Sequence, residues 1–384
     1  MTHYFFMLLT IIVFLFILSI LVLIHEFGHF LVGRINGIKI EEFALGLPFT
    51  RPIFSKKLKD GMKISLYPIL FGGFVKLLGE ETSEKSKNAF NRKNVWQRIS
   101  VVVAGVTMNL LLAIFCFYLF LGFSGFKVVI PKFSDFKFTS PTAPAVAITA
   151  VLDESPAKKA GLSAGDIILN VDSKKFSSLP DFQKYVRNQA GKEVTFLVAD
   201  TALSQEKKVT LIPRENPPKG EGPMGVGVGD ALVISYISPQ EKFYSGLSYT
   251  ADMFGYNISV IGHFASSAIK EKSVEPLSES VSGPVGIASA VGSILDLGGI
   301  TALIQLFNLL GLLSLSLAFM NILPFPALDG GRLAFLLVEA FTGKKLSVSH
   351  ENRVNQIGMI FLLGLIILVS ASDLIKIISP LLPH

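Results

Sequence analysis

Residues 5–32, FFMLLTIIVFLFILSILVLIHEFGHFLV, are almost wholly apolar until they reach two histidines and a glutamate. About 20 mostly apolar residues are enough for a helix to cross the hydrocarbon of a bilayer, so this stretch predicts a membrane-spanning helix. Ionisable side chains inside such a helix are costly and usually functional. His25, Glu26 and His29 therefore predict a functional site at the membrane.

The pattern H-E-x-x-H has a specific chemistry. His25 and His29 are four residues apart, so on a helix they share one face and can both bind a Zn2+ ion. Glu26 stands beside the first histidine and can act as a general base toward water at the metal. A chance match on a helix is the alternative, but the cost of placing three ionisable groups in a membrane argues against it.

The composition indicates a membrane protein. Half of the 384 residues are hydrophobic and only 17% are charged, and the mean hydropathy is +0.55. Four segments are long and apolar enough to span a bilayer, namely Phe5–Val32, Ile99–Phe123, Leu303–Leu323 and Ile357–Ile378. A cleaved signal peptide is the alternative for the first, but its apolar stretch is longer than a signal requires and no small-residue cleavage pattern follows.

The charge pattern predicts the orientation. Lysine and arginine are frequent between residues 34 and 98 and again between 332 and 353, and such short basic connections stay cytoplasmic. Both chain termini are then expected outside. The net charge of +6 reflects this topology, and no nucleic-acid-binding module accompanies it. The single cysteine, Cys116, excludes an intramolecular disulfide and is expected to be a packing residue.

Two histidines do not complete a catalytic zinc site, which takes three protein ligands and a water. The candidate third ligand is Asp329, in NILPFPALDGGR at residues 321–332, at the cytoplasmic end of the third span. An Asp-Gly turn that ends a helix is the other interpretation. The predicted topology favours the ligand, because the first and third spans bring both motifs toward the same membrane face.

On these motifs the chain resembles the site-2 protease family of intramembrane zinc metalloproteases, of the bacterial regulator of sigma-E protease type. The resemblance covers nearly the whole length. Besides H-E-x-x-H, it rests on LFGGFVKLLGE at residues 70–80, FNRKNVWQRISVVVAGVTMN at 90–109, GPVGI at 283–287 and NILPFPALDGGR. The joint match is far more specific than any one motif.

The resemblance implies that His25, His29 and Asp329 bind Zn2+ and that Glu26 is the general base. The chain departs from the family at two positions. Val106 stands where relatives usually have proline in the second span, which predicts a straighter helix near Asn109. Ser316 stands where a polar residue, often asparagine, is common, and it retains only part of that hydrogen-bonding capacity.

A helical substrate must unwind before water can reach its carbonyls, so a strand partner is expected. Residues 62–78 contain β-favouring runs broken by Pro68 and Gly72-Gly73, which predicts a bent hairpin or looped strands. An ordinary cytoplasmic hairpin is the simple reading. The resemblance implies a membrane re-entrant β-loop, whose edge pairs with substrate. The candidate substrate-binding residues are Gly72, Gly73, Phe74 and Asn321, although Asn321 could equally make a contact between helices.

Residues 144–215 are more charged than the rest of the chain. Their sequence pattern predicts the order strand, short helix, strand, helix, strand. GLSAGDII at residues 161–168 resembles the hallmark of PDZ domains, which bind chain ends by strand addition. A spacer domain is the simple reading. The resemblance implies a domain that binds or screens extracytoplasmic chain ends, so that only trimmed substrates reach the membrane site. Residues 216–300 predict a connecting segment with an interfacial amphipathic helix, where His263 is expected to be a packing residue.

Together these features predict a polytopic α-helical membrane protein with a membrane-associated β-loop and one α+β PDZ domain outside the membrane. Residues 1–123 hold the first two spans and 301–384 the last two. The predicted function is a zinc metalloendopeptidase of the bacterial cytoplasmic (inner) membrane, whose active site faces the cytoplasm. Its expected partners are single-pass membrane proteins such as anti-sigma factor-like regulators, remnant signal peptides and lipid. The alternatives are a noncatalytic PDZ-containing scaffold that binds chain ends, or a metal-dependent transporter, for which few intramembrane charges are present.

Overall fold

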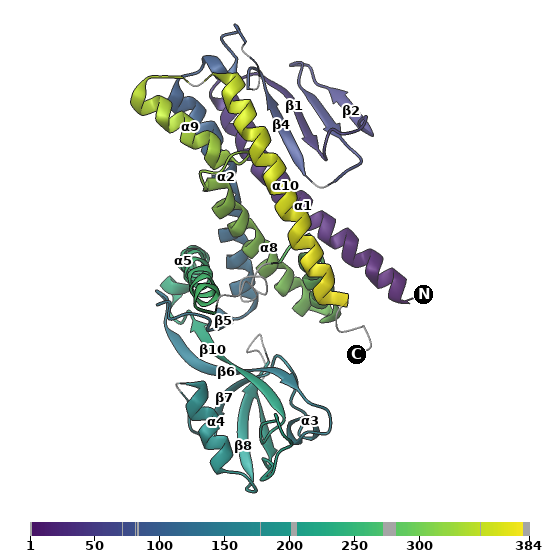
Figure 1. Cartoon of the computed structure of the whole chain (residues 1–384), viewed down its shortest axis with the longest axis vertical. Helices are drawn as coiled ribbons and strands as arrows, with labels where there is room; N and C mark the ends of the chain where they lie inside the picture. The colour runs from purple at the N-terminus through teal and green to yellow at the C-terminus, as the bar shows by residue number, and fades with distance from the viewer. Residues whose placement is uncertain are drawn as a thin grey trace. The chain divides into compact units, whose positions relative to one another are not determined.

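The chain forms two compact units in a computed structural model that describes residues 2–70, 72–80, 82, 84–176, 178–200, 206–271, 282–345 and 347–378. The first unit contains residues 1–116 and 273–384, and the second contains residues 117–272. The first and last helices of the chain, coloured purple and yellow in Figure 1, therefore belong to the first unit.

Four helices in the described residues are long and apolar enough to cross a membrane, which confirms the predicted number of spans. They are α1 (Thr2–Ile35), α2 (Val95–Phe123), α8 (Gly299–Ile322) and α10 (Val348–Ile378). Most of these helices start a few residues before the predicted spans, because the helical conformation continues into flanking polar residues. Exposed apolar side chains are numerous on α1 and α10, as expected for helices that face lipid.

Two shorter helices complete the first unit. The apolar helix α7 (Pro284–Asp296) packs against α1 and α10. The N–H groups of Gly283 and Gly286, at the start of α7, donate to the Asp373 carboxylate of α10 at 2.9 and 2.8 Å. The helix α9 (Asp329–Thr342) begins at the predicted third ligand. Asp329 thus starts a separate helix instead of ending the third span, because the prolines after Ile322 cannot continue α8.

A four-stranded sheet lies between α1 and α2 in sequence. Its strands are β1 (Ile40–Leu45), β2 (Phe54–Lys57), β3 (Lys63–Leu66) and β4 (Gly73–Leu77), in the order β2-β3-β1-β4. A bent hairpin or looped strands were expected within residues 62–78. The strands are present, but the hairpin is wrong, because β1 lies between β3 and β4. It pairs parallel with β3 and antiparallel with β4. A short 3-10 helix, η1 (Phe90–Arg92), precedes α2.

The edge strand β4 packs on α1, where the two histidines lie. Gly73 permits this contact, because a Cβ there would lie 2.8 Å from the carbonyl oxygen of Ala44 and 3.2 Å from a methyl group of Val22 on α1. Gly72 precedes it with φ of 139°, a conformation that other residues rarely adopt. The Gly72-Gly73 pair therefore turns the chain into an edge strand held close to the first helix.

The second unit is built on a six-stranded sheet in the order β5-β10-β6-β7-β8-β9. The strands are β5 (Lys127–Pro131), β6 (Thr142–Val151), β7 (Ile167–Val171), β8 (Val194–Ala199), β9 (Glu206–Leu211) and β10 (Val226–Ser235). With the helices α3 (Pro156–Lys159) and α4 (Leu179–Asn188), β6 to β8 follow the predicted element order. The sheet also includes β5 and β10, which lie outside residues 144–215.

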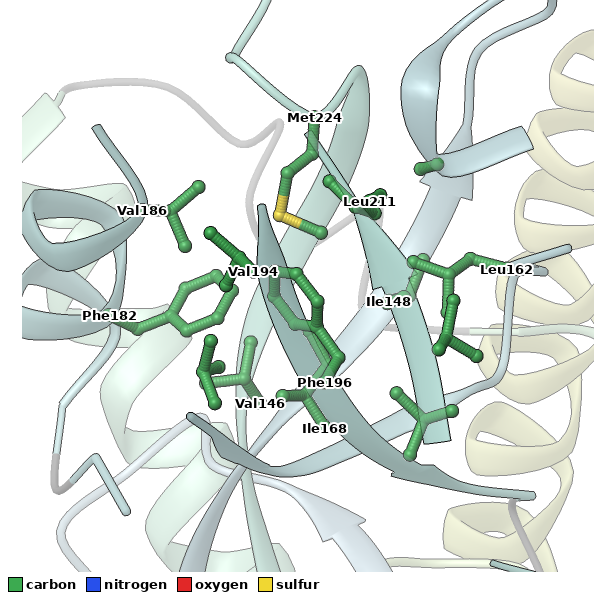
Figure 2. Packing of buried hydrophobic residues seen from close by; sticks show 14 residues of the cluster. Val146, Ile148, Leu162, Ile168, Phe182, Val186, Val194, Phe196, Leu211 and Met224 are labelled. Atoms are coloured by element: carbon green, nitrogen blue, oxygen red, sulfur yellow. The ribbon is translucent and has the colours of Figure 1, made fainter. Parts of the chain in front are cut away.

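The core of the second unit lies between this sheet and its two short helices. Figure 2 shows Phe182 and Val186 of α4 beside Phe196 and Val146 of the sheet, with Met224 closing one side. These side chains are almost fully buried, which is the main source of stability for such a domain. The predicted amphipathic helix is present as α5 (Pro239–Glu271). Its Tyr249 contacts Phe117, in the last turns of α2, with ring centroids 5.0 Å apart.

Candidate metal centre

Three predicted ligands converge in the first unit. His25 and His29 extend from one face of α1, and Asp329 from the first turn of α9. The Nε2 atoms of the two histidines lie 3.1 Å apart. The Oδ2 atom of Asp329 lies 3.0 Å from Nε2 of His25 and 3.3 Å from Nε2 of His29. One oxygen and two nitrogens thus form a small triangle.

This triangle fits a tetrahedral metal ion. Zinc bonds of about 2.0–2.2 Å at tetrahedral angles separate two ligand atoms by about 3.3–3.6 Å, close to the observed edges. The Oδ2 atom of Asp329 is buried and makes no well-aligned hydrogen bond within the described residues, although two imidazoles adjoin it. Burial favours the neutral acid, but the imidazoles of His25 and His29 hold the pKa of Asp329 well below its usual range. A charged, buried oxygen of this kind suits a cation.

Each histidine has a polar partner for its other ring nitrogen. The Nδ1 atom of His29 lies 2.8 Å from the carbonyl oxygen of Val101, which can only accept, so Nδ1 carries the proton and Nε2 is free to bind metal. The Nδ1 atom of His25 lies 3.3 Å from the side-chain nitrogen of Asn109, whose Oδ1 atom is buried without a partner. Turning that amide by 180° lets Oδ1 accept from His25 and leaves its Nε2 free as well.

Asn109 is therefore a neighbour of the metal centre, supplied by the second span. Residue 106 lies within the continuous helix α2, so the valine there keeps the helix intact up to this side chain. Ser314 of α8 donates to the backbone oxygen of Asn109 at 2.7 Å. The sequence showed Asn109 in its family motif but gave it no role, and its contact with His25 depends on the packing of α1 on α2.

Small residues allow α2 to approach the ligands. A Cβ on Gly105 would lie 2.4 Å from Nε2 of His29 and 2.7 Å from Cε1 of His25. On α1, a Cβ on Gly28 would lie 2.4 Å from the carbonyl oxygen of Ala104. Real Cβ atoms essentially never come within 3.0 Å of such neighbours. The glycines are thus required by the close contact of two helices at the metal site, as in other membrane helix pairs.

Asp329 is held in place by the packing of α9. Cβ atoms on Gly330 and Gly331 would lie 2.1 Å from the oxygen of Leu323 and 2.4 Å from that of Phe325. Further along α9, Glu339 forms a buried ion pair with Arg98 of α2, with Nη1 and Oε2 3.0 Å apart. The two glycines after Asp329 therefore let α9 lie directly on the chain segment that precedes it.

Glu26 lies beside the triangle and is fixed by the edge strand. Its Oε2 atom accepts a hydrogen bond from the backbone N–H of Val75 in β4 at 2.9 Å. A cavity of about 200 Å³ is lined by Glu26, the three candidate ligands, Phe74 and Val75, among others. A second, larger cavity of about 610 Å³ is lined by polar and apolar residues of α10 and around the start of α9, and it shares Glu80, Asp329 and Arg332 with the first. A nucleophilic water therefore has space beside the candidate base.

The predicted substrate-binding residues are only partly assembled here. Phe74 lines the cavity that contains the candidate ligands. Gly72 and Gly73 shape β4 without lining either cavity, and Asn321 is half-buried in the last turn of α8. The sequence did not single out Val75, Gly105, Glu80 or Arg332, because their roles depend on contacts between distant segments.

Comparisons with known proteins agree with this chemistry. The sequence profile described as Peptidase family M50 matches residues 13–365. A protein of Clostridium perfringens is 31% identical over 93% of this chain and 96% of its own length. Others from Clostridium acetobutylicum and Rickettsia conorii are each 30% identical, over 93% and 97% of this chain and 95% and 100% of their own lengths. All three are named zinc metalloproteases.

Proposed function

The chain belongs to Peptidase family M50 and is a zinc metalloprotease with membrane-spanning helices, and from that premise we propose that it cleaves peptide bonds within the membrane. The proposed substrates are the transmembrane segments of single-pass proteins, among them anti-sigma factor-like regulators and remnant signal peptides. One observation carries the proposal. The two convergent nitrogens and Glu26 beside them are supplied by α1, a helix that is itself apolar enough to span a bilayer, and Asp329 at the start of α9 adds the oxygen.

In the proposed mechanism His25, His29 and Asp329 hold the metal. When bound there, Zn2+ supplies Lewis acidity toward water and the scissile carbonyl. Glu26 accepts the proton of the attacking water and passes it to the leaving amine. The Val75 N–H orients the Glu26 carboxylate, and the Nδ1 partners of the two histidines fix which nitrogens face the metal.

The substrate is proposed to bind as an added strand at β4. This strand has β1 on one side only within the described residues, and Phe74 and Val75 line the cavity beside the candidate ligands. An unwound segment that pairs with β4 would keep its backbone polar groups hydrogen-bonded, which the membrane requires. It would also bring a carbonyl next to Glu26.

Removal of the metal tests the proposed chemistry. Purified protein in detergent should contain about one equivalent of zinc and should cleave a single-pass reporter within its transmembrane segment. Chelation should abolish cleavage, and stoichiometric Zn2+ should restore it. Cleavage outside the apolar segment, identified by mass spectrometry of the fragments, would contradict an intramembrane reaction. A zinc-replete enzyme that binds the reporter without cutting it would instead support the scaffold alternative.

We further propose that the second unit is a PDZ-like domain that contacts or screens extracytoplasmic chain ends, with the active site toward the cytoplasm of a bacterial inner membrane. Support comes from a groove between α4 and the start of β10, lined by Phe182, Val186, Val226 and Val228 among others. Deleting residues 145–213 would split the sheet, since β10 pairs with β6. Point substitution is therefore the better test.

Val226→Arg places a charged side chain at this groove, while Thr210→Arg on the exposed face of β9 is a matched control. If the groove binds chain ends, Val226→Arg should weaken cleavage of a trimmed reporter by about tenfold and Thr210→Arg should not. Equal rates for both variants and the wild type would leave screening by size as the role of this unit. Size screening is measured as the ratio of the cleavage rates of the trimmed and untrimmed reporters.

A further inference from the structure

Carboxylates cover the edge of β4 that faces away from β1. The N–H of Val75 donates to Glu26 at 2.9 Å, and the N–H of Leu77 donates to Oε2 of Glu80 at 3.2 Å. Groups two residues apart in a strand leave it on the same side, and β1 occupies the other side. Two N–H groups that an added strand would use are therefore already bonded to side chains.

Glu80 is fastened in this position by Arg332. The guanidinium forms an ion pair with Oε1 of Glu80, and its Nη2 atom donates to the backbone oxygen of Glu80 at 3.0 Å. It also lies 4.9 Å from the ring centroid of Phe90 and 3.4 Å from a carboxylate oxygen of Glu351 on α10. Burial disfavours the cation, but Glu80 and Glu351 raise the pKa of Arg332 above its ordinary value. Glu80 is thus tied to α9, three residues beyond Asp329.

Glu80 lies where a substrate bound along β4 would meet it. Glu80, Asp329 and Arg332 line both the cavity of about 200 Å³ that contains the candidate ligands and the cavity of about 610 Å³ next to it. A peptide that lay along β4 past Val75 would reach Leu77 about 7 Å further on. It would meet the Glu80 carboxylate there.

We propose that Glu80 is an internal cap on the edge of β4, which a substrate strand displaces from the Leu77 N–H in order to pair. The inference rests on the proposed function in one respect, the pairing of substrate with β4. The Val75 contact with Glu26 marks the position of the scissile bond, so the cap acts on substrate residues beside that bond. Covering an edge strand prevents unwanted pairing, and only segments that unwind far enough to offer a full strand displace the carboxylate.

Removing the cap should favour substrate binding. Glu80→Ala frees the Leu77 N–H and leaves Arg332 paired with Glu351. We expect KM for a membrane reporter to fall by about 5- to 10-fold, the worth of one typical hydrogen bond, while kcat stays within about twofold. Glu80→Gln retains an oxygen for Leu77 but loses the ion pair, so its KM should lie between those of Glu80→Ala and the wild type.

Glu351→Gln is the matched control, because it removes the other partner of Arg332 without touching β4. Its KM should match that of the wild type. A KM that rises in Glu80→Ala, or a kcat that collapses at full zinc content, overturns the cap and shows that Glu80 supports the cleft. Equal decreases of KM in Glu80→Ala and Glu351→Gln also overturn it, because the effect then comes from loosening Arg332.

A binding measurement separates this inference from the proposed function. A fluorescent 25-residue apolar peptide with a central Gly-Pro break serves as the probe in detergent, in proteins that also carry Glu26→Gln. Adding Glu80→Ala should tighten binding by about 5- to 10-fold. If the wild type cleaves no reporter, the proposed function fails while this comparison still reports on the cap. If the wild type cleaves but the peptide binds both proteins equally, only the cap fails.

Discussion

Glu26→Gln is expected to lower the cleavage rate of a membrane reporter by about 10²–10⁴-fold, the usual contribution of a general base. The amide cannot accept the proton of water, so the reaction loses its base. Its oxygen can still accept the hydrogen bond that Val75 donates to Glu26 at 2.9 Å, so the side chain should keep its orientation. Zinc should remain bound at about one equivalent, since Glu26 is not among the convergent atoms.

The measurement combines a reporter assay with metal analysis of the same purified samples. Glu41→Gln is a suitable control, because Glu41 pairs with Lys76 on the surface of the same sheet at 3.3 Å and an exposed pair contributes little. It should cleave at the wild-type rate. If Glu26→Gln kept more than about a tenth of the wild-type rate at full zinc content, Glu26 would not be the base.

The sequence predicted the local parts of the metal centre. The spacing of His25 and His29 requires only one helix, and the apolar runs of the spans are continuous, so neither depends on distant packing. Asp329 was assigned by combining its motif with the predicted topology. The sequence did not show that Asp329 begins its own helix, because the two glycines after it act through close packing on residues 322–326.

The sheets were harder to predict, since strand pairing is a long-range property. The strands within residues 62–78 were recognised from β-favouring runs between turn residues, but β1 was missed and it separates them. In the second unit, β10 follows the predicted domain and pairs with β6 from Val226 and Val151 to Ile234 and Thr142. The local sequence pattern does not determine which residues pair across two strands, because this register depends on the partner strand.

Gly105→Ala is expected to remove the metal while leaving the protein folded. The added Cβ would lie 2.4 Å from Nε2 of His29 and 2.7 Å from Cε1 of His25, in space that the rings occupy. The ring of His29 has little room to retreat, because its Nδ1 atom is bonded to Val101 on the same helix, α2. We expect the zinc content to fall to less than about a tenth of an equivalent, since a small displacement of two of three ligands weakens binding severely. Cleavage should fall with it.

The matched control for this substitution is Gly122→Ala, also on α2, where a Cβ would meet no atom within 4 Å. Replacing glycine by alanine within a helix favours the helix by about 1 kcal/mol, so both variants should retain their helical content and the control its thermal stability. Metal analysis measures the zinc content of the two proteins, and circular dichroism shows whether both are folded. A folded Gly105→Ala protein with a full equivalent of zinc would contradict the proposed ligand geometry, because the imidazoles of His25 and His29 could not then lie where a methyl group excludes them.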